Sequence, residues 1–363
     1  AGAIEGGTAP DGGLWVPEHW PQTFGPAQSG EDAEAFGRWA VPRAKQWLDL
    51  TVGTDGLDGA LDLPIGLRPL GPRIDLLDLS RGPTGAFKDI GSRFLAALWA
   101  GSPRPDGRPR TVLVATSGDT GGAVAAAIER VDHLRGVVVF PIDRVSEVQR
   151  RQFTTGSDRV RAVGVRGTFD DCQALVREAL GNVGLVNAAG LVSANSINPG
   201  RLLPQVLYYG WLAAVAPGRP IVVPSGNLGN VTAAIFAREM GADLGPIHAA
   251  VNENDALVRA SRNRAAAEGP AVRTDSSAMD VAAPSNLERL LWIADSSGTS
   301  LDAILDAAAV GVGEARDARR WASSSEGIVL DPHTAVGVAR ALALEEAEPA
   351  YRPIVVETAH PAK

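Results

Sequence analysis

The segment RGPTGAFKDIGSRF, residues 81–94, contains a lysine at a position typical of the start of a helix. Lysine is rare in this chain, because only three of the 34 basic residues are lysines: Lys45, Lys88 and Lys363. A lysine amine becomes a nucleophile where its surroundings favour the neutral form, and its best-known use is a Schiff base with a carbonyl cofactor. Lys88 is therefore a candidate catalytic residue, although an ordinary surface lysine in a first helical turn fits the same pattern.

Two segments share one layout, in which a strand leads into Ser-Gly-Asp/Asn-x-Gly and then into a helix. They are TVLVATSGDTGGAVAAAI, residues 111–128, and PIVVPSGNLGNVTAAIF, residues 220–236. A glycine turn that leads into a helix exposes free backbone N–H groups at the positive end of the helix dipole, which forms a site for an anion. Neither segment contains a GxGxxG fingerprint or a P-loop. Ordinary strand-to-helix turns remain the alternative for each.

A candidate Schiff-base lysine and two anion turns suit pyridoxal phosphate (PLP), which has an aldehyde for the lysine and a phosphate for a helix N-terminus. The residues alone therefore predict a PLP enzyme. The loop expected to hold the cofactor phosphate consists of Ser225, Gly226, Asn227, Leu228, Gly229 and Asn230. The other turn would hold a second anion, such as the carboxylate of an amino-acid substrate, and consists of Thr116, Ser117, Gly118, Asp119, Thr120 and Gly121.

The composition limits the class of protein. At 363 residues with 45% hydrophobic content, the chain can bury a large core and is expected to form two or three lobes. Its net charge of −8 and pI of about 5.3 argue against nucleic acid or an anionic membrane as a partner. The single cysteine, Cys172, excludes an intramolecular disulfide and a zinc cluster, and fits a reduced, cytoplasmic setting. No apolar run approaches the roughly 20 residues of a membrane span, and the first residues are not a signal peptide.

Short β-branched runs alternate with alanine-rich helical stretches from residue 111 onward. GVVVFP and PIVVPSG are examples of the runs, and GGAVAAAIERV and NVTAAIFAREM are examples of the helices. Near-continuous apolar strands of this kind are typical of parallel sheets covered on both faces, so we expect an α/β protein. The first 75 residues carry more Gly, Pro and Trp and predict a separate N-terminal lobe.

The segment GPTGAFKD resembles the lysine motif of the threonine synthase family, whose members are fold-type II PLP enzymes. Further segments match that family, in its own order, over nearly the whole chain: APDGGLWVPE, ATSGDTGGAV, FDDCQALV, ANSINPGR, VPSGNLGN, VNENDAL, MDVAAPSNLERL, LDPHTAVGVA and TAHPAK. The resemblance implies two parallel-sheet lobes, similar to tryptophan synthase β, and a small N-terminal lobe. The expected domains are residues 1–75 for the N-terminal lobe, 76–98 with 205–363 for the large PLP-binding domain, and 99–204 for the small substrate-side domain.

The resemblance also implies a role for each candidate residue. Lys88 would be the Schiff-base lysine and the catalytic base, and residues 225–230 would hold the cofactor phosphate. Thr358 would lie at the pyridine nitrogen, and Asp119 beside the cofactor ring. The substrate carboxylate would contact Thr116, Ser117, Gly118 and Thr120, and the substrate phosphate would contact Asn195, Ser196 and Arg201. No metal site is expected.

The implied reaction converts O-phosphohomoserine and water into threonine and phosphate by β,γ-elimination and replacement. A lysine amine can move the protons, and arginine presents a planar fork to a leaving phosphate. One alternative is a related PLP enzyme that acts on another γ-activated or phosphorylated amino acid, or with another nucleophile. A second is a non-catalytic protein that binds a phosphorylated metabolite, although the retained lysine and phosphate loop argue against it. We expect a monomer or a homodimer.

The chain departs from the family pattern at several positions. Arg81 replaces a usual histidine, Gly85 a usual leucine, and Pro199-Gly200 stands where an aromatic residue is usual. We expect Arg81 to point outward and to pair with a carboxylate such as Asp78; the alternative is an inward guanidinium beside Arg201. Relative to the family the chain also starts late and stops early, so we expect further residues at its ends, with a truncated homologue as the alternative.

Other polar residues have simpler structural interpretations. Cys172 is expected to pack in a helix, and His333 and His360 to brace turns. Asp170 and Asp171 are expected to cap a helix start, without binding a metal. Asn286 and Glu288 are expected to take part in domain packing.

Overall fold

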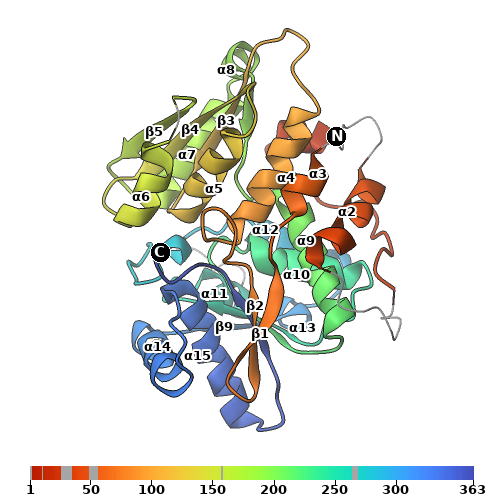
Figure 1. Ribbon diagram of the computed structural model, residues 1–363, viewed down its shortest axis with the longest axis vertical. Helices are drawn as coiled ribbons and strands as arrows, with labels where there is room; N and C mark the ends of the chain where they lie inside the picture. The colour runs from red at the N-terminus through yellow and green to blue at the C-terminus, as the bar shows by residue number, and fades with distance from the viewer. Residues whose placement is uncertain (1, 10, 26–34, 49–55, 157, 264–268) are drawn as a thin grey trace.

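The computed structural model describes residues 2–9, 11–25, 35–48, 56–156, 158–263 and 269–363 (Figure 1). The strands are β1 Gly66–Leu70, β2 Ile74–Asp78, β3 Arg110–Ala115, β4 Leu134–Pro141, β5 Val160–Val165, β6 Leu191–Ser193, β7 Ile221–Pro224, β8 Ile247–Val251, β9 Asp306–Ala309 and β10 Ile354–Glu357. The helices are α1 Gly2–Gly6, α2 Phe36–Trp47, α3 Leu57–Leu61, α4 Lys88–Ala100, α5 Asp119–Ile128, α6 Glu147–Thr154, α7 Phe169–Gly181, α8 Val183–Ala189, α9 Pro199–Val215, α10 Gly229–Glu239, α11 Ala256–Arg262, the short 3-10 turn η2 Ser277–Met279, α12 Leu287–Ser296, α13 Leu301–Ile304, α14 Val312–Ser325 and α15 Pro332–Ala347. Of the helices in these ranges, none is both long and apolar enough to cross a membrane.

The smaller sheet has four parallel strands in the order β5-β4-β3-β6. Its central strands are apolar at successive positions because both faces are covered. Val112 and Val114 pack in a cluster with α5, whereas Leu113 packs on the opposite face with Phe169 and Cys172 of α7. Alternate side chains of one strand thus enter two different clusters, as expected for a parallel sheet between helices.

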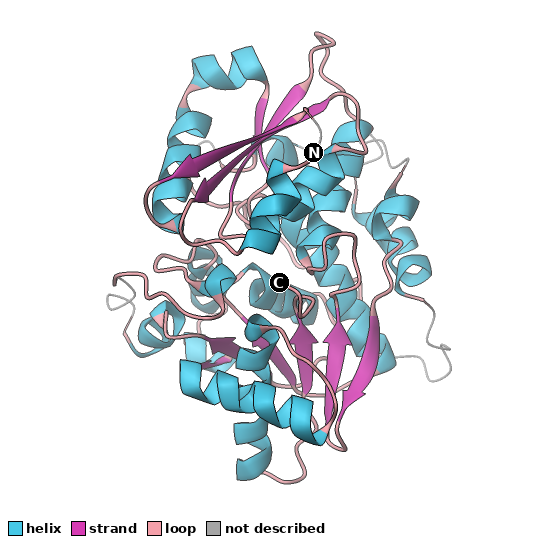
Figure 2. Cartoon of the chain, turned by 60° about the vertical axis from the view of Figure 1, so that its left-hand side comes forward, coloured by secondary structure: helices cyan, strands magenta, loops and turns pink. Residues whose placement is uncertain are grey.

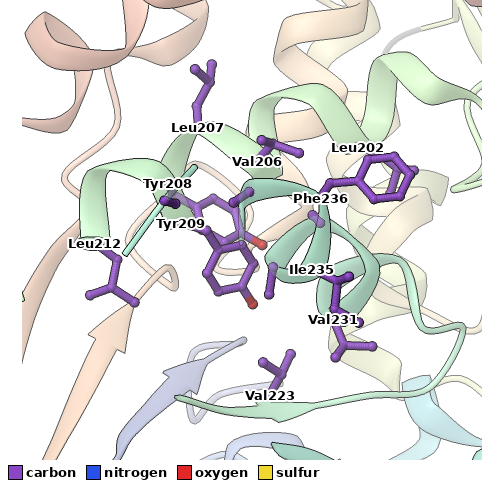
Figure 3. Packing of buried hydrophobic residues seen from close by; sticks show 14 of the residues in the cluster. Leu202, Val206, Leu207, Tyr208, Tyr209, Leu212, Val223, Val231, Ile235 and Phe236 are labelled. Atoms are coloured by element: carbon purple, nitrogen blue, oxygen red, sulfur yellow. The ribbon is translucent and has the colours of Figure 1, made fainter. Parts of the chain in front are cut away.

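The larger sheet has six strands in the order β1-β2-β10-β7-β8-β9. Ile221 and Val223 of β7 face the cluster built by α9 and α10 (Figure 3), and Val222 faces α15 on the other side. Five strands run parallel, while β1 is antiparallel to β2. The predicted α/β architecture is observed, but the sequence patterns did not indicate this antiparallel edge strand.

The two sheets lie one above the other in Figure 2, and the C-terminal end lies between them. The segments that follow β2, β3, β6, β7 and β10 lead into α4, α5, α9, α10 and the last residues of the chain. Parallel strands end at one edge of their sheet, so such segments gather where a ligand is usually bound in open α/β sheets.

The strands are distributed along the chain in a simple way. The four strands of the smaller sheet fall within residues 99–204, and β7 to β10 fall within residues 205–363. The β1 strand precedes residue 76 but belongs to the larger sheet. The domain boundaries given above remain a prediction.

Candidate active site

A cavity lies where these segments meet, with roughly 790 Å³ of space between protein atoms that includes its opening to solvent. Fourteen of the predicted site residues line it: Lys88, Ser117, Asp119, Thr120, Asn195, Ser196, Arg201, Ser225, Gly226, Asn227, Leu228, Gly229, Asn230 and Thr358. Thr116 and Gly118 are not among the lining residues. The fold therefore brings together segments that are up to 270 residues apart along the chain, from Lys88 to Thr358.

Lys88 is the first residue of α4, and its side chain is only 18% exposed. Its Nζ lies 3.7 Å from Oδ2 of Asp119 and 4.8 Å from the ring centroid of Phe87. Burial lowers the pKa of Lys88 and Asp119 opposes the change, while the positive charge of Arg201 adds to it. Lys88 is thus a cavity lysine whose surroundings favour the neutral amine, and the surface alternative does not describe it.

The turn before Lys88 is fixed on two sides. The buried carboxylate of Asp89 accepts hydrogen bonds from the backbone N–H and the hydroxyl of Thr84, at 2.9 and 2.8 Å. The N–H of Phe87 donates to the carbonyl of Thr358. Gly85 has a φ of 70°, a left-handed conformation that a leucine would adopt only with strain. The departure from leucine at Gly85 therefore follows from the local backbone.

The loop before α10 has the geometry of an anion site. Leu228 has a φ of 60° and is the only residue other than glycine with positive φ in the described ranges. This conformation aims the first N–H groups of α10 out of the turn, at the positive end of the helix dipole. A Cβ on Gly226 would lie 2.7 Å from Cα of Met279, so only glycine fits there.

The side-chain amide of Asn230 is hydrogen-bonded within the protein through its oxygen but not through its nitrogen. Its Oδ1 accepts hydrogen bonds from the hydroxyls of Tyr208 and Tyr209, which are buried on α9. Both rings appear in Figure 3, packed between α9 and α10. The buried Nδ2 of Asn230 has no protein partner. Since buried donors are almost always paired, this one fits an acceptor such as a phosphate oxygen in the cavity.

Thr358 contributes a second unpartnered group to the cavity. Its N–H donates to the hydroxyl of Thr334, while its own Oγ1 is buried and has no protein partner. A neutral hydroxyl there suits a ring nitrogen. A cavity lysine, a helix N-terminus and this hydroxyl are the donors that PLP requires, so the residues present fit that cofactor.

The turn before α5 divides into residues that face the cavity and residues that shape the turn. Ser117, Asp119 and Thr120 line the cavity. The hydroxyl of Thr116 instead accepts hydrogen bonds from the N–H groups of Gly118 and Gly121, both at 2.9 Å. Gly118 has a φ of 141°, and a Cβ on it would collide with Gln149. The structure thus does not bring Thr116 or Gly118 to the cavity wall as predicted, because their role in the turn occupies them.

Arg201 is a buried cation without a matching anion. It is 3% exposed, and its Nη1 donates to the carbonyl of Ala194 at 2.6 Å, while its Nε has no partner. Among the described residues no carboxylate lies within ion-pair distance of it. Burial lowers the pKa of Arg201 to about 10. An unpaired buried charge is costly, which indicates a site built for an anionic ligand.

Ser196 is held so that it must donate. Its Oγ accepts hydrogen bonds from Nδ2 of Asn227 at 2.7 Å and from Nδ2 of Asn286 at 3.1 Å. Because both acceptor positions are used, the hydroxyl proton is left for a ligand in the cavity. In Asn195, in contrast, Oδ1 accepts a hydrogen bond from the N–H of Ala115 and Nδ2 donates one to the carbonyl of Ala115. Of the predicted pair, Ser196 is therefore the one free to bind an anion.

Asn286 was expected to take part in domain packing. Its hydrogen bond to Ser196 shows that it also holds a residue of the cavity wall in place. Arg289, which is fully buried, donates to Oδ1 of Asn286 and to the carbonyls of Ser196 and Ile197. This arginine links α12 to the loop that carries Ser196. Glu288 lies between them in sequence but is exposed. The segment MDVAAPSNLERL pointed to this region without distinguishing these roles.

The two histidines have the structural roles expected of them. Nε2 of His333 accepts a hydrogen bond from the N–H of Ala278, and its Nδ1 contacts Asp331, the N-cap of α15. His360 is exposed and its Nδ1 accepts from the N–H of Ala362. Both histidines therefore brace turns, although His333 also lines the cavity.

The acidic pair and the cysteine lie near one helix start. Thr168 is the N-cap of α7, and Asp171 completes a capping box with it. Asp170 accepts a hydrogen bond from the N–H of Ala282. Cys172 is fully buried, and burial raises the pKa of its thiol to about 12. The described residues contain no cluster that could bind a metal.

The departures from the family pattern have local explanations. Nε of Arg81 lies 2.5 Å from Oδ2 of Asp78, and its side chain is 59% exposed. The outward orientation predicted for Arg81 is confirmed. Pro199 is the first residue of α9, where its missing N–H costs nothing. A Cβ on Gly200 would lie 2.5 Å from Cδ2 of Leu95, so a larger residue there would require Leu95 to move.

Comparison with known proteins gives matches over most of the chain. A family model described as "Pyridoxal-phosphate dependent enzyme" matches residues 62–357. The chain is 34% identical to threonine synthase from Haemophilus influenzae, over 99% of this chain and 85% of that protein. It is 31% identical to threonine synthase from Pseudomonas aeruginosa, over 98% and 84%.

Solved structures give a similar result. The crystal structure of threonine synthase from Escherichia coli superposes with a TM-score of 0.87 at 32% identity, covering 99% of this chain and 85% of that one. The PLP-bound threonine synthase from Brucella melitensis gives a TM-score of 0.83 at 31% identity, covering 99% and 86%.

Proposed function

Because the chain belongs to the pyridoxal-phosphate dependent enzymes and, within them, to the threonine synthase family, we propose that it converts O-phosphohomoserine and water into threonine and phosphate. It is a PLP-dependent lyase of the fold-type II class. The alternatives of a diverted enzyme and of a non-catalytic binding protein are not favoured, since relatives that cover 85–99% of the chain are threonine synthases.

When bound, PLP supplies an aldehyde for a lysine and an electron-withdrawing ring for the substrate carbons. We assign the aldehyde to Lys88 and the cofactor phosphate to residues 225–230 with the N-terminus of α10. We assign the ring nitrogen to the hydroxyl of Thr358. The unpartnered Nδ2 of Asn230 and Oγ1 of Thr358 support these assignments, because each is a buried polar atom that faces the same cavity as Lys88.

Lys88 is the base in this proposal. Its amine must be neutral to take a proton from a substrate carbon, and its burial favours that state. No other described side chain in the cavity wall offers a free base, since Asp119 is engaged by Lys88 and both nitrogens of His333 are in contact with Ala278 and Asp331. One amine therefore has to serve each of the proton transfers.

Arg201 and Ser196 bind the phosphate of the substrate. Negative charge grows on this group as it leaves, so a fixed guanidinium and a committed hydroxyl donor stabilise it most at that point. The substrate carboxylate lies at the N-terminus of α5, where Ser117 and Thr120 face the cavity. The observation that carries the proposal is the environment of Arg201. Its buried side chain lines the same cavity as Lys88, and no described carboxylate lies within ion-pair distance of it.

A product assay tests the function. Purified protein loaded with PLP should release threonine and phosphate in equal amounts from O-phosphohomoserine. O-phosphoserine and O-acetylhomoserine should give kcat/KM values lower by at least about tenfold, because each lacks either the chain length or the phosphate. A higher kcat/KM on one of these compounds than on O-phosphohomoserine would assign the enzyme to a different substrate.

Arg81→His should keep most of the activity on O-phosphohomoserine. The Arg81–Asp78 pair is largely exposed, and such pairs contribute little. We expect kcat/KM to stay within about threefold of the wild-type value, as measured beside Arg316→His, which changes an arginine of α14 that is 56% exposed and pairs with Asp275. A loss greater than tenfold for Arg81→His alone would mean that this residue reaches the substrate.

We also propose a cytoplasmic enzyme without nucleic-acid or membrane partners, acting as a monomer or homodimer. The net charge of −8 supports the absence of polyanionic partners. The lone, buried Cys172 is compatible with a reducing compartment.

A further inference from the structure

Two of the three lysines of the chain meet at one carboxylate. Nζ of Lys363 lies 3.1 Å from Oδ1 of Asp119, and Nζ of Lys88 lies 3.7 Å from Oδ2 of the same residue. Lys363 is 2% exposed, and Asp119 is buried as well. In a chain that uses arginine for nearly all of its basic positions, a second buried lysine beside the Schiff-base lysine requires a physical reason.

Lys363 is held in place by the same turn that presents Lys88. In the segment after β10, Ala359 forms an isolated bridge with Ala86, and the N–H of His360 donates to the carbonyl of Gly85 at 2.8 Å. The two lysines are thus attached to strands of backbone that are hydrogen-bonded to each other. Figures 1 and 2 show this end of the chain between the two sheets.

Lys363 has one further partner and does not reach the ligand. Its Nζ donates to Oε1 of Gln152 on α6 at 2.5 Å. It is absent from the residues that line the cavity, whereas Asp119 is among them. Lys363 therefore acts on Lys88 from outside the cavity, through the repulsion between the two charges and through Asp119, which also accepts a hydrogen bond from Gln149 at 3.0 Å.

The charged groups around Lys88 and Asp119 indicate how Lys363 affects the charge states of these two residues. The charges of Asp119, Arg201 and Lys363 act on Lys88. The charges of both lysines and of His333 act on Asp119. Burial alone would raise the pKa of Asp119, but the two lysines outweigh it and hold the pKa below its usual range. When Lys88 is a neutral amine, Lys363 is the one cation among the described residues that remains in contact with the buried carboxylate.

We propose that Lys363 is a positioning residue, which acts as the permanent counter-ion of Asp119 and thereby leaves Lys88 free to lose its charge. The proposal rests on the proposed function only in taking Lys88 as the base. With Lys363 present, Asp119 stays ionised whether or not Lys88 carries a proton. Without Lys363, the carboxylate would depend on Lys88 alone and would hold it as an ammonium ion.

Lysine labelling measures this effect directly in the PLP-free protein. Trace acetic anhydride reacts with neutral amines, and peptide mass spectrometry separates the three lysines. In Lys363→Met, the labelling midpoint of Lys88 should move up by about one pH unit, which lowers its labelling rate about tenfold at any pH below the midpoint. The sign follows because a cation is removed and Asp119 is left to stabilise the Lys88 ammonium.

The PLP-loaded enzyme gives a second readout. The acid limb of its kcat profile, which reports the complex with substrate, should move to higher pH in Lys363→Met, since Lys88 acts as a base only after the substrate has replaced it on the aldehyde and must then be neutral. Lys363→Arg, which keeps the charge, should restore both values. Lys45→Met is the matched control, because Lys45 also pairs with an aspartate, Asp58, but is 43% exposed on α2.

The proposal is overturned if Lys88 keeps its labelling midpoint in a folded Lys363→Met protein, or if Lys363→Arg shifts it as far as Lys363→Met does. If Lys363→Met does not fold, as judged by circular dichroism, Lys363→Gln replaces it and keeps N–H donors for Asp119 and Gln152. These results are independent of the product assay. A wild-type protein that is inactive on O-phosphohomoserine would refute the proposed function, while the labelling shift would still decide the role of Lys363.

Discussion

Lys88→Ala should abolish turnover and covalent retention of the cofactor together. The substitution removes both the amine that binds the aldehyde and the base, and general-base catalysis alone is worth about 10²–10⁴-fold. We expect kcat on O-phosphohomoserine to fall by at least about 10³-fold. Borohydride reduction followed by peptide mass spectrometry should find PLP attached to residue 88 in the wild type and to no residue in the variant.

Lys45→Ala provides the comparison, since it removes an exposed lysine that pairs with Asp58 on the outside of the molecule. It should keep wild-type turnover and wild-type labelling at Lys88. Substantial activity of Lys88→Ala, or a reduced adduct at another lysine, would end the assignment of Lys88 as the Schiff-base residue and base.

Arg201→Met should separate activity from stability. The substitution removes the guanidinium proposed to hold the substrate phosphate, and loss of one such donor costs about 10²–10³-fold in rate. The folded protein, however, loses a buried charge that is only partly offset by Asp89 and that has no described carboxylate within ion-pair distance. We therefore expect kcat/KM on O-phosphohomoserine to fall by about 10²–10³-fold, with a melting temperature equal to or above that of the wild type.

Arg289→Met is the matched substitution at another buried arginine. Arg289 donates to the carbonyls of Trp15, Ser196 and Ile197 and to Asn286, so its removal leaves several acceptors unpaired. It should lower the melting temperature where Arg201→Met does not. Retention of more than about a tenth of the wild-type kcat/KM in Arg201→Met would place the substrate phosphate elsewhere.

Short motifs predicted much of the site because local backbone geometry determines them. A strand, a glycine turn and a helix follow one another within 18 residues, so the loop at residues 225–230 and the turn at residues 116–121 could be located without the fold. Lys88 was recognisable through its rarity and its place at a helix start. The family resemblance supplied Thr358 and Arg201, which no local pattern would have selected.

What the sequence could not provide is which way a polar side chain turns once the chain has folded. The hydroxyl of Thr116 and the amide of Asn195 could bind an anion, but both are already hydrogen-bonded to nearby backbone groups. Asn286 gains its role from a contact with Ser196, 90 residues away in sequence. Lys363 shares the rarity that singled out Lys88, yet only the tertiary structure shows that the two lysines share one carboxylate.

The position of β10 in the larger sheet bears on how the protein is made. This strand lies between β2 and β7, although it follows all the other described strands in the sequence. During synthesis, the other strands of this sheet therefore leave the ribosome before β10, which joins the two halves of the sheet. The facing edges of β2 and β7 stay unpaired until β10 is made. Thr358, which lines the cavity, and Lys363, which pairs with Asp119, follow the same strand. Closure of the sheet and completion of the cavity proposed to bind PLP thus depend on the same short segment, residues 354–363.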